Sequence, residues 1–220
     1  DYYYFYKNNG LQNHSVLYRQ KDINGEPEVV IDPNTLSADG TVGMGSFVYS
    51  KDGNYAAYTL SKGGSDWQEI FIMDLRTLKN LPEKLEWVKV SGISWKGDGF
   101  YYSRYPAPEG SALAAKNENH QVYFHKIGTP QSADRLVYSN PQFPQRFNTV
   151  STTDDEKFAL LYVSYRGSGK DGHALYILDE KDKLIPIKDE ITYFNYGVAD
   201  NFGDVLLIMT NENSPNGKVV

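Results

Sequence analysis

The chain has 220 residues, of which 40% are hydrophobic and 14% aromatic, and its formal net charge is −6. A chain of this length can bury a sizeable core in one or two domains. The negative charge argues against a nucleic-acid partner, because a phosphate backbone is bound by basic patches. The chain has no cysteine, which excludes a disulfide framework and a thiolate metal site within it.

The sequence carries no apolar run long enough to span a membrane and no visible signal peptide, so we expect no membrane partner. A cysteine-free chain suits the cytoplasm and the periplasm equally, and the compartment stays open. The sequence begins without Met, inside an expected strand, and ends at Val220 inside another. We therefore expect a fragment of a longer protein.

Short strands separated by turns are predicted along the first third of the chain. The aromatic run 2–6 ends at Asn8-Asn9-Gly10, and further strands are expected at 16–19 and 28–31. Residues 47–74 then predict three strands in a row, with an Asp-Gly hairpin turn at 52–53 and a loop at 63–66. The strand at 55–60 carries apolar residues on both faces, so we expect it to be covered from two sides.

The same strand-turn-strand pattern returns three times further along. The copies start near Ile93, Val150 and Gly197, and each has a turn rich in Asp and Gly or Asp and Glu. Between the first two copies lies a polar insertion, 108–120, whose 112–116 piece is expected to form at most a short helical turn, followed by a strand at 121–127.

The spacing of these copies predicts the architecture. The second strands of the four copies begin near 55, 101, 158 and 205, which gives intervals of 46, 57 and 47 residues. A repeat of about this length, built of strands, is typical of one four-stranded propeller blade. A β-sandwich is the alternative, but a sandwich has no reason to keep the interval. The predicted fold is all-β, a partial propeller of about four to five four-stranded antiparallel blades.

Motifs spread over nearly all 220 residues resemble those of one known family. The sequence Gly10-Leu11-Gln12-Asn13 with Val16-Leu17-Tyr18, the turn Asp32-Pro33-Asn34, the loop Gly64-Ser65-Asp66-Trp67 and the dipeptide Tyr105-Pro106 occur in an order similar to that of the prolyl oligopeptidase propeller. The resemblance implies a seven-bladed propeller that caps an α/β-hydrolase domain and gates the cleavage of short peptides after proline. Residues 1–220 would then be one partial propeller domain, with units at about 1–45, 46–91, 92–146, 147–192 and 193–220.

Catalytic machinery is not expected in this chain. A hydrolase nucleophile elbow needs Gly-x-Ser-x-Gly, and the nearest stretch, Gly43-Met44-Gly45-Ser46-Phe47, has its serine in the wrong place. The four histidines are scattered and form no zinc motif, so we expect no metal site and no cofactor. The carboxylates at 154–156 sit in a turn, where a solvated turn is a better interpretation than acid-base chemistry.

The resemblance implies two positions near the substrate cavity. The arginine of the fourth unit falls on Arg166, the one substrate-binding residue we predict; its alternative is an ordinary loop arginine. A second position, aromatic in the family, falls on Val90, which puts an aromatic contact there in doubt.

Two functions from different classes stand at this point. The first is the gating propeller of a prolyl-specific serine endopeptidase, with the C-terminal hydrolase domain of the same chain and proline-containing peptides as partners. The second is a stand-alone propeller scaffold that binds a protein partner. In both cases we expect the 220 residues alone to be inactive, and the apolar end faces of an incomplete ring to favour self-association.

Overall fold

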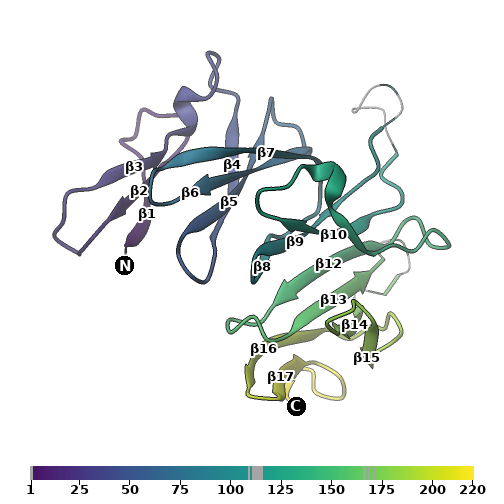
Figure 1. Cartoon of the computed structure of the whole chain (residues 1–220). Coiled ribbons are helices and arrows are strands. Elements are labelled where there is room, and N and C mark those ends of the chain that lie inside the picture. Colours follow the sequence, from purple (N-terminus) through teal and green to yellow (C-terminus); the bar gives the residue numbers. More distant parts are fainter. Residues whose placement is uncertain (1, 109, 111–115, 166, 168, 171) are drawn as a thin grey trace. The chain divides into compact units, whose positions relative to one another are not determined.

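A computed structural model describes residues 2–108, 110, 116–165, 167, 169–170 and 172–220 (Figure 1). In these residues the regular structure consists of β-strands and two three-residue 3-10 turns, η1 (Pro33–Thr35) and η2 (Gln131–Ala133). The described part contains no helix with the length and apolarity to cross a bilayer. The chain divides into two compact units, residues 1–86 and 87–220, and each is described by itself.

The first unit opens with an antiparallel three-stranded sheet. Its strands are β1 (Tyr3–Lys7), β2 (Val16–Gln20) and β3 (Glu28–Ile31), in that spatial order. The predicted strands at 2–6, 16–19 and 28–31 are confirmed to within about a residue or two. Asp32 then begins η1, where its side chain accepts a hydrogen bond from the Asn34 N–H.

The next strands of the first unit are β4 (Gly43–Tyr49), β5 (Tyr55–Ser61), β6 (Gln68–Asp74) and β7 (Lys79–Val88), paired in sequence order. The predicted hairpin is present, but residues 50–54 form a longer connection than a two-residue Asp-Gly turn. The reason is local: the Ser50 hydroxyl bonds to Asp52 and to the Tyr55 carbonyl, which extends the loop, and Gly53 alone supplies a positive φ of 68° there.

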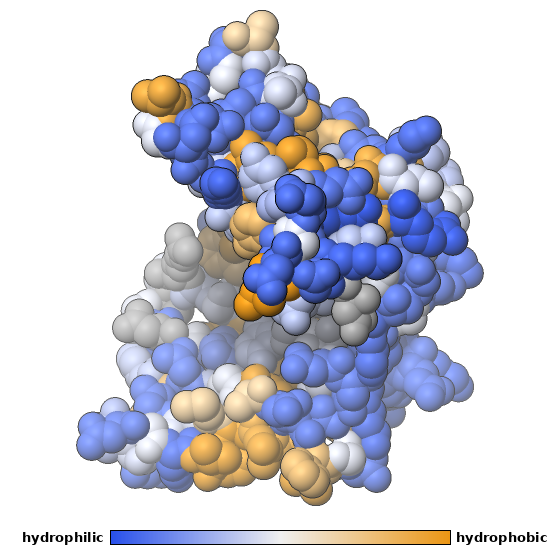
Figure 2. All heavy atoms as spheres, turned by 90° about the vertical axis from the view of Figure 1, so that its left-hand side faces the viewer, coloured by the Kyte–Doolittle hydropathy of each residue, from blue (hydrophilic) through white to orange (hydrophobic). Residues whose placement is uncertain are grey.

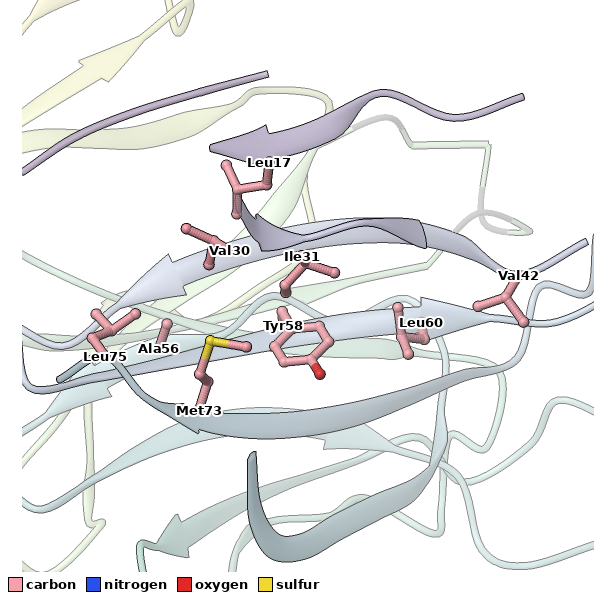
Figure 3. Packing of buried hydrophobic residues seen from close by; sticks show 9 residues of the cluster. All are labelled: Leu17, Val30, Ile31, Val42, Ala56, Tyr58, Leu60, Met73 and Leu75. Atoms are coloured by element: carbon pink, nitrogen blue, oxygen red, sulfur yellow. The ribbon is translucent and has the colours of Figure 1, made fainter. Parts of the chain in front are cut away.

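The core of the first unit lies between these two groups of strands (Figure 3). Leu17, Val30 and Ile31 come from β2 and β3, and they face Tyr58 and Met73 of β5 and β6. Residues 56–60 of β5 are all buried, as expected for a strand covered from two sides. Burial of apolar surface at about 25 cal/mol per Å² is what holds the two sheets together.

The second unit contains three antiparallel sheets. They are formed by the following strands: β8 (Ser94–Lys96), β9 (Gly99–Arg104), β10 (Gln121–Lys126) and β11 (Arg135–Tyr138); β12 (Phe147–Thr152), β13 (Ala159–Ser164), β14 (His173–Leu178) and β15 (Leu184–Lys188); β16 (Tyr196–Phe202), β17 (Val205–Thr210) and β18 (Lys218–Val219). Each strand pairs with the next along the chain, which is the meander of a propeller blade.

The three sheets stack face to face, and each interface has its own apolar cluster. One cluster joins the first sheet, through Tyr101 and Val122, to Leu161 and Val163 of the second. The other joins Leu160 and Leu175 to Tyr196 and to partly buried residues of β17. Alternating residues of β13 therefore supply both clusters, so both faces of this sheet are covered. The all-β, partial propeller fold predicted from the sequence is confirmed.

Neighbouring sheets of the second unit are also joined by hydrogen bonds at one end. Lys96, the last residue of β8, donates from Nζ to the carbonyl oxygens of Glu156 and Lys157 at 2.7 and 3.1 Å. The Gly97 N–H donates to the Glu156 carboxylate at 2.8 Å. From the following sheet, Asn201, near the end of β16, donates from Nδ2 to Asp155 Oδ2 at 2.8 Å. At this end, the turn between β12 and β13 is thus hydrogen-bonded to the hairpin of β8 and β9 and to the end of β16.

The last sheet leaves an apolar face open to water. Val205, Met209 and Val219 are 61%, 54% and 62% exposed. Figure 2 shows apolar side chains gathered along the lower edge of the molecule, at the height where β16 and β17 lie in Figure 1.

The assignment of residues 1–220 to one domain with five units stays a prediction, and the expected helical turn at 112–116 lies almost wholly outside the described residues.

Candidate functional site

A buried Asp-His pair in the second unit is the arrangement most similar to catalytic machinery among the described residues. His125 Nδ1 lies 2.7 Å from Asp134 Oδ1, and the Tyr102 hydroxyl donates to Asp134 Oδ2 at 2.6 Å. Burial raises the pKa of Tyr102 well above its usual value, and the hydrogen bond to Asp134 acts in the same direction. His125 Nε2 is buried without a hydrogen-bond partner, so no serine hydroxyl of the described residues is hydrogen-bonded to it. Within the described residues the arrangement is an Asp-His pair without a nucleophile beside it.

His120 is a second buried histidine, and its contacts identify a structural role. Its Nε2 donates to the Lys89 carbonyl at 2.9 Å, and its Nδ1 accepts from the Asn148 N–H at 2.9 Å. This pattern requires the neutral ring. Burial lowers the pKa of His120 to about 4, which keeps the ring neutral near pH 7. His120 holds the segment 87–91, where Val90 has a positive φ of 53°.

The carboxylates at 154–156 are turn and inter-sheet contacts. Asp155 Oδ1 accepts from the Lys157 N–H and from the Thr153 hydroxyl within its own turn. Glu156 accepts from Gly97 of the preceding sheet. The carboxylates of Asp155 and Glu156 are therefore occupied by structural hydrogen bonds, within the turn and to a neighbouring sheet. In the described residues no group of three His, Cys, Asp or Glu side chains is arranged to hold a metal ion.

Arg166, the predicted substrate-binding residue, lies outside the described residues. Its position in the chain is nevertheless bracketed: β13 ends at Ser164, and β14 begins at His173 and pairs with it at Ser164↔His173. The connection between them leaves the sheet at the same end as the start of β12 and the end of β15. This end of the sheet β12–β15 is the candidate site.

A cavity of about 320 Å³ opens at this end of the sheet. Its lining residues come from the start of β12, the connection after β13, the strand β14 and the segment after β15; they are Arg146, Tyr165, Lys170, Ala174, Tyr176, Asp189, Glu190 and Ile191. Its floor is continuous with the apolar cluster between the first two sheets of the second unit, because Ala174, Tyr176 and Ile191 belong to both. The cavity combines a partly apolar floor with charged groups of both signs, which is typical of a ligand site.

Two polar side chains of the cavity are held by hydrogen bonds to main-chain carbonyl groups. The Tyr176 hydroxyl donates to the Asp189 carbonyl at 2.9 Å, and Lys170 Nζ donates to the Ile191 carbonyl at 3.1 Å. Burial raises the pKa of Tyr176, and the nearby Arg146 guanidinium opposes that shift. The phenol is therefore a neutral hydrogen-bonding group near pH 7.

Val90, the second position implied by the resemblance, is 41% exposed and not part of this cavity. A β-branched residue with positive φ is uncommon. The segment around it is fixed by the Tyr105 N–H, which donates to the Trp87 carbonyl, and by the Ser103 N–H, which donates to Ser91 Oγ. A contact between substrate and Val90 stays untested.

The sequence did not predict Arg146, Tyr176 or Asp189 as site residues. They are separated by up to about forty positions, and only the pairing of β12 through β15 brings them to one end of a sheet. The sequence offered one signal for grouping them. In a run of four antiparallel strands, the connections lie alternately at the two ends of the sheet, so the residues before the first strand, between the second and third, and after the fourth share one end.

Known proteins give the family of this chain. The whole chain, residues 1–220, matches the model for the prolyl oligopeptidase N-terminal beta-propeller domain. It is 45% and 46% identical, over 225 residues, to prolyl endopeptidases of Elizabethkingia miricola and Elizabethkingia meningoseptica, with 100% of this chain and 31% of each relative covered. It is also 31% identical to prolyl oligopeptidase A of Galerina marginata, with 34% of that protein covered.

Solved structures give the same result. A structure from a structural and mechanistic analysis of two prolyl endopeptidases has a TM-score of 0.86 at 28% identity, covering 100% of this chain and 31% of that chain. Prolyl oligopeptidase B of Galerina marginata, bound to a 25mer macrocyclization substrate, also has a TM-score of 0.86, at 31% identity, covering 99% and 34%. The chain spans about a third of the length of the relatives it matches, and it belongs to the prolyl oligopeptidase family as the N-terminal β-propeller part.

Proposed function

We propose that this chain is the substrate-gating propeller of a prolyl-specific serine endopeptidase that cleaves short peptides after proline. The observation that carries the proposal is 45% identity, over the whole chain, to a prolyl endopeptidase. A propeller that caps the catalytic domain would admit only short, unfolded peptides. The partners are then the α/β-hydrolase domain of the same chain and the peptide itself.

Arg166 is proposed to line the substrate cavity, at the end of the sheet where the cavity of Arg146 and Tyr176 opens. A guanidinium can donate two parallel hydrogen bonds to a carboxylate or bond to a peptide carbonyl. Two observations support this placement. The connection that contains Arg166 joins two paired strands, β13 and β14, and two described residues of that connection, Tyr165 and Lys170, line the cavity.

The self-association of the isolated 220 residues is a second proposal, supported by the exposed apolar face of β17.

The test uses the full-length natural protein that contains this segment. A series of peptides with one internal proline, from four to about forty residues, should be cleaved after proline, with kcat/KM falling steeply once the peptide folds. A serine-directed reagent should abolish the activity. Cleavage with no preference for proline would refute the assignment, and a full-length protein without hydrolase activity would favour the stand-alone scaffold.

A further inference from the structure

Arg146 is the most unusual charged residue of the cavity at the end of β12–β15. It immediately precedes β12, and its N–H donates to the Phe143 carbonyl at 3.1 Å. Its guanidinium carbon lies 3.8 Å from the centroid of the Phe143 ring. A turn hydrogen bond and a cation–π contact therefore hold the guanidinium at the cavity wall.

The guanidinium has no acceptor among the described residues. Its Nε is buried without a hydrogen-bond partner. Asp189 and Glu190 line the same cavity, but within the described part of the chain no ion pair joins either carboxylate to Arg146. Arg19 and Arg76 differ from Arg146, because Arg19 pairs with Glu28 and Arg76 with Asp74, each at 2.8 Å. Arg104 shares a buried, unpartnered Nε with Arg146, but it does not line this cavity. A buried donor without an acceptor costs roughly 1–3 kcal/mol, so this arrangement calls for a ligand.

We propose that this cavity binds a carboxylate of the peptide substrate, with the Arg146 guanidinium as its partner. A carboxylate accepts two parallel hydrogen bonds from a guanidinium edge, and entry of the ligand would let the guanidinium turn so that Nε–H becomes one donor. The apolar floor of Ala174 and Ile191 suits the carbon atoms next to the carboxylate. The inference rests on the proposed peptidase function for the identity of the ligand.

Charge selects a carboxylate over a phosphate. The lining residues carry two positive side chains, Arg146 and Lys170, and two negative ones, Asp189 and Glu190. Lys170 already donates to the Ile191 carbonyl. A bound phosphate, with nearly two negative charges, would lie near Asp189 and Glu190 and would have only the Arg146 guanidinium to neutralise it. A ligand with one carboxylate carries a single negative charge, which that guanidinium can neutralise.

A peptide carries a carboxylate either at its C-terminus or on an acidic side chain. Three proline peptides of the same length distinguish the sources: one ends in a free carboxylate, one ends in an amide, and one ends in an amide but has Glu in place of an Ala after the proline. Full-length protein should cleave at least one carboxylate peptide with kcat/KM about tenfold above the amide, the worth of one charge-assisted hydrogen bond.

The variants separate the site from general electrostatics. In Arg146→Gln, kcat/KM should be about the same for the carboxylate peptide and the amide peptide, so that their ratio is about one. Arg146→Lys should keep part of the preference for the carboxylate peptide. Lys157→Gln removes the same charge from the opposite end of the β12–β13 hairpin, where Lys157 pairs with Asp204, and should leave the ratio unchanged. The proposal is overturned if wild-type protein cleaves both carboxylate-bearing peptides with about the same kcat/KM as the amide peptide. It is also overturned if Arg146→Gln keeps the wild-type preference for a carboxylate-bearing peptide.

A binding measurement keeps this inference separate from the proposed function. If the full-length protein cleaves none of the peptides, the peptidase assignment has failed, and calorimetric titration with proline-free alanine peptides still tests the cavity. The carboxylate peptide should then bind about tenfold more tightly than its amide, and Arg146→Gln should remove the difference. Equal affinity of both peptides for wild-type protein, or tighter binding of inorganic phosphate at the same site, would contradict a carboxylate site.

Discussion

His120 shows how one buried side chain can make stability depend on pH. The ring is neutral, and its pKa is lowered by burial to about 4, whereas an unfolded histidine has a pKa of 6.5. Between these values the unfolded chain binds more protons than the folded one. The contribution of His120 to stability is therefore complete above about pH 6.5, decreases as the pH falls, and levels off below about pH 4.

We expect this titration to cost up to about 3 kcal/mol in the free energy of unfolding between pH 7 and pH 4, at 1.36 kcal/mol per pKa unit. His120→Gln cannot titrate in this range. The measurement is urea unfolding of wild type and variant at several pH values, and the quantity to follow is the difference between them. The difference in the free energy of unfolding between wild type and His120→Gln should become smaller as the pH falls. A difference that stays constant with pH would show that His120 is not held neutral by burial.

Arg166 is tested by a single truncation in the full-length protein. If its guanidinium hydrogen-bonds a substrate oxygen, Arg166→Ala should raise KM or lower kcat/KM by roughly tenfold on proline peptides. Arg166→Lys should recover part of the loss, because a point charge replaces the guanidinium. Steady-state kinetics on a short and a longer peptide decide the matter, and unchanged constants on both would make Arg166 an ordinary loop residue.

The hairpin of β8 and β9 contains two positions where glycine is required, each for a different physical reason. Gly97 has a positive φ of 60° and open space around it, so its requirement comes from the backbone. Gly99 has no such φ, but a Cβ there would collide with the His125 carbonyl oxygen and lie 2.8 Å from the Phe124 ring. The second requirement comes from the close approach of β10.

We expect Gly97→Ala to lower the free energy of unfolding by about 1 kcal/mol, the cost of left-handed backbone in a residue with a Cβ. Gly99→Ala should cost about 3 kcal/mol, because β9 and β10 must separate. Hydrogen exchange distinguishes them: the amides of Tyr101 and Tyr123 should lose protection in Gly99→Ala and keep most of it in Gly97→Ala. Equal effects of the two changes would contradict this account of the hairpin.

Central strands were predictable from the sequence, but outer strands and the cavity were not. The strands β5, β13 and β17 have nearly continuous apolar residues after a turn rich in Asp and Gly or Asp and Glu, and both signals are local. In contrast, β7 carries Pro82 and several charged residues, so its alternation is weak, and it is a strand because β6 pairs with it. The cavity depends in the same way on pairing, since its lining residues come from separate strand ends.

At the scale of the whole molecule, the open end faces should govern the behaviour of the isolated 220 residues. Val205, Leu207, Met209 and Val219 are exposed on the last sheet, and Tyr3 and Val29 on the first. A contiguous apolar face of several hundred Å² usually acquires a partner, at about 25 cal/mol per Å² buried. We expect self-association, or loss of order in the outermost strands.

Light scattering combined with hydrogen exchange on residues 1–220 checks this prediction. Self-association should give a concentration-dependent mass, and Leu207→Lys together with Met209→Lys should reduce it by placing charge on the face. A surface change of the same kind away from that face, Thr129→Lys, is the control. A monodisperse wild-type monomer with slowly exchanging amides in both 3–7 and 205–209 would show that the open faces are tolerated.

The activity of the isolated segment is a separate prediction. The 220 residues contain no Gly-x-Ser-x-Gly, and where the structure describes the chain, no nucleophile is hydrogen-bonded to the buried Nε2 of the Asp134–His125 pair. We therefore expect no hydrolysis of a chromogenic proline peptide above the buffer rate. Turnover that survives further purification and is blocked by a serine-directed reagent would be evidence against this.

The hydrogen bonds between neighbouring sheets at one end of the second unit imply a particular kind of cooperativity. Lys96 and Gly97 bond to the turn at 156–157, and Asn201 bonds to Asp155, so each sheet is coupled to its immediate neighbour. In a linear array of this kind, stability is approximately additive over units and nearest-neighbour interfaces. The middle sheet, with two interfaces, should unfold last, and fraying should begin at β16–β18 and travel inward one sheet at a time.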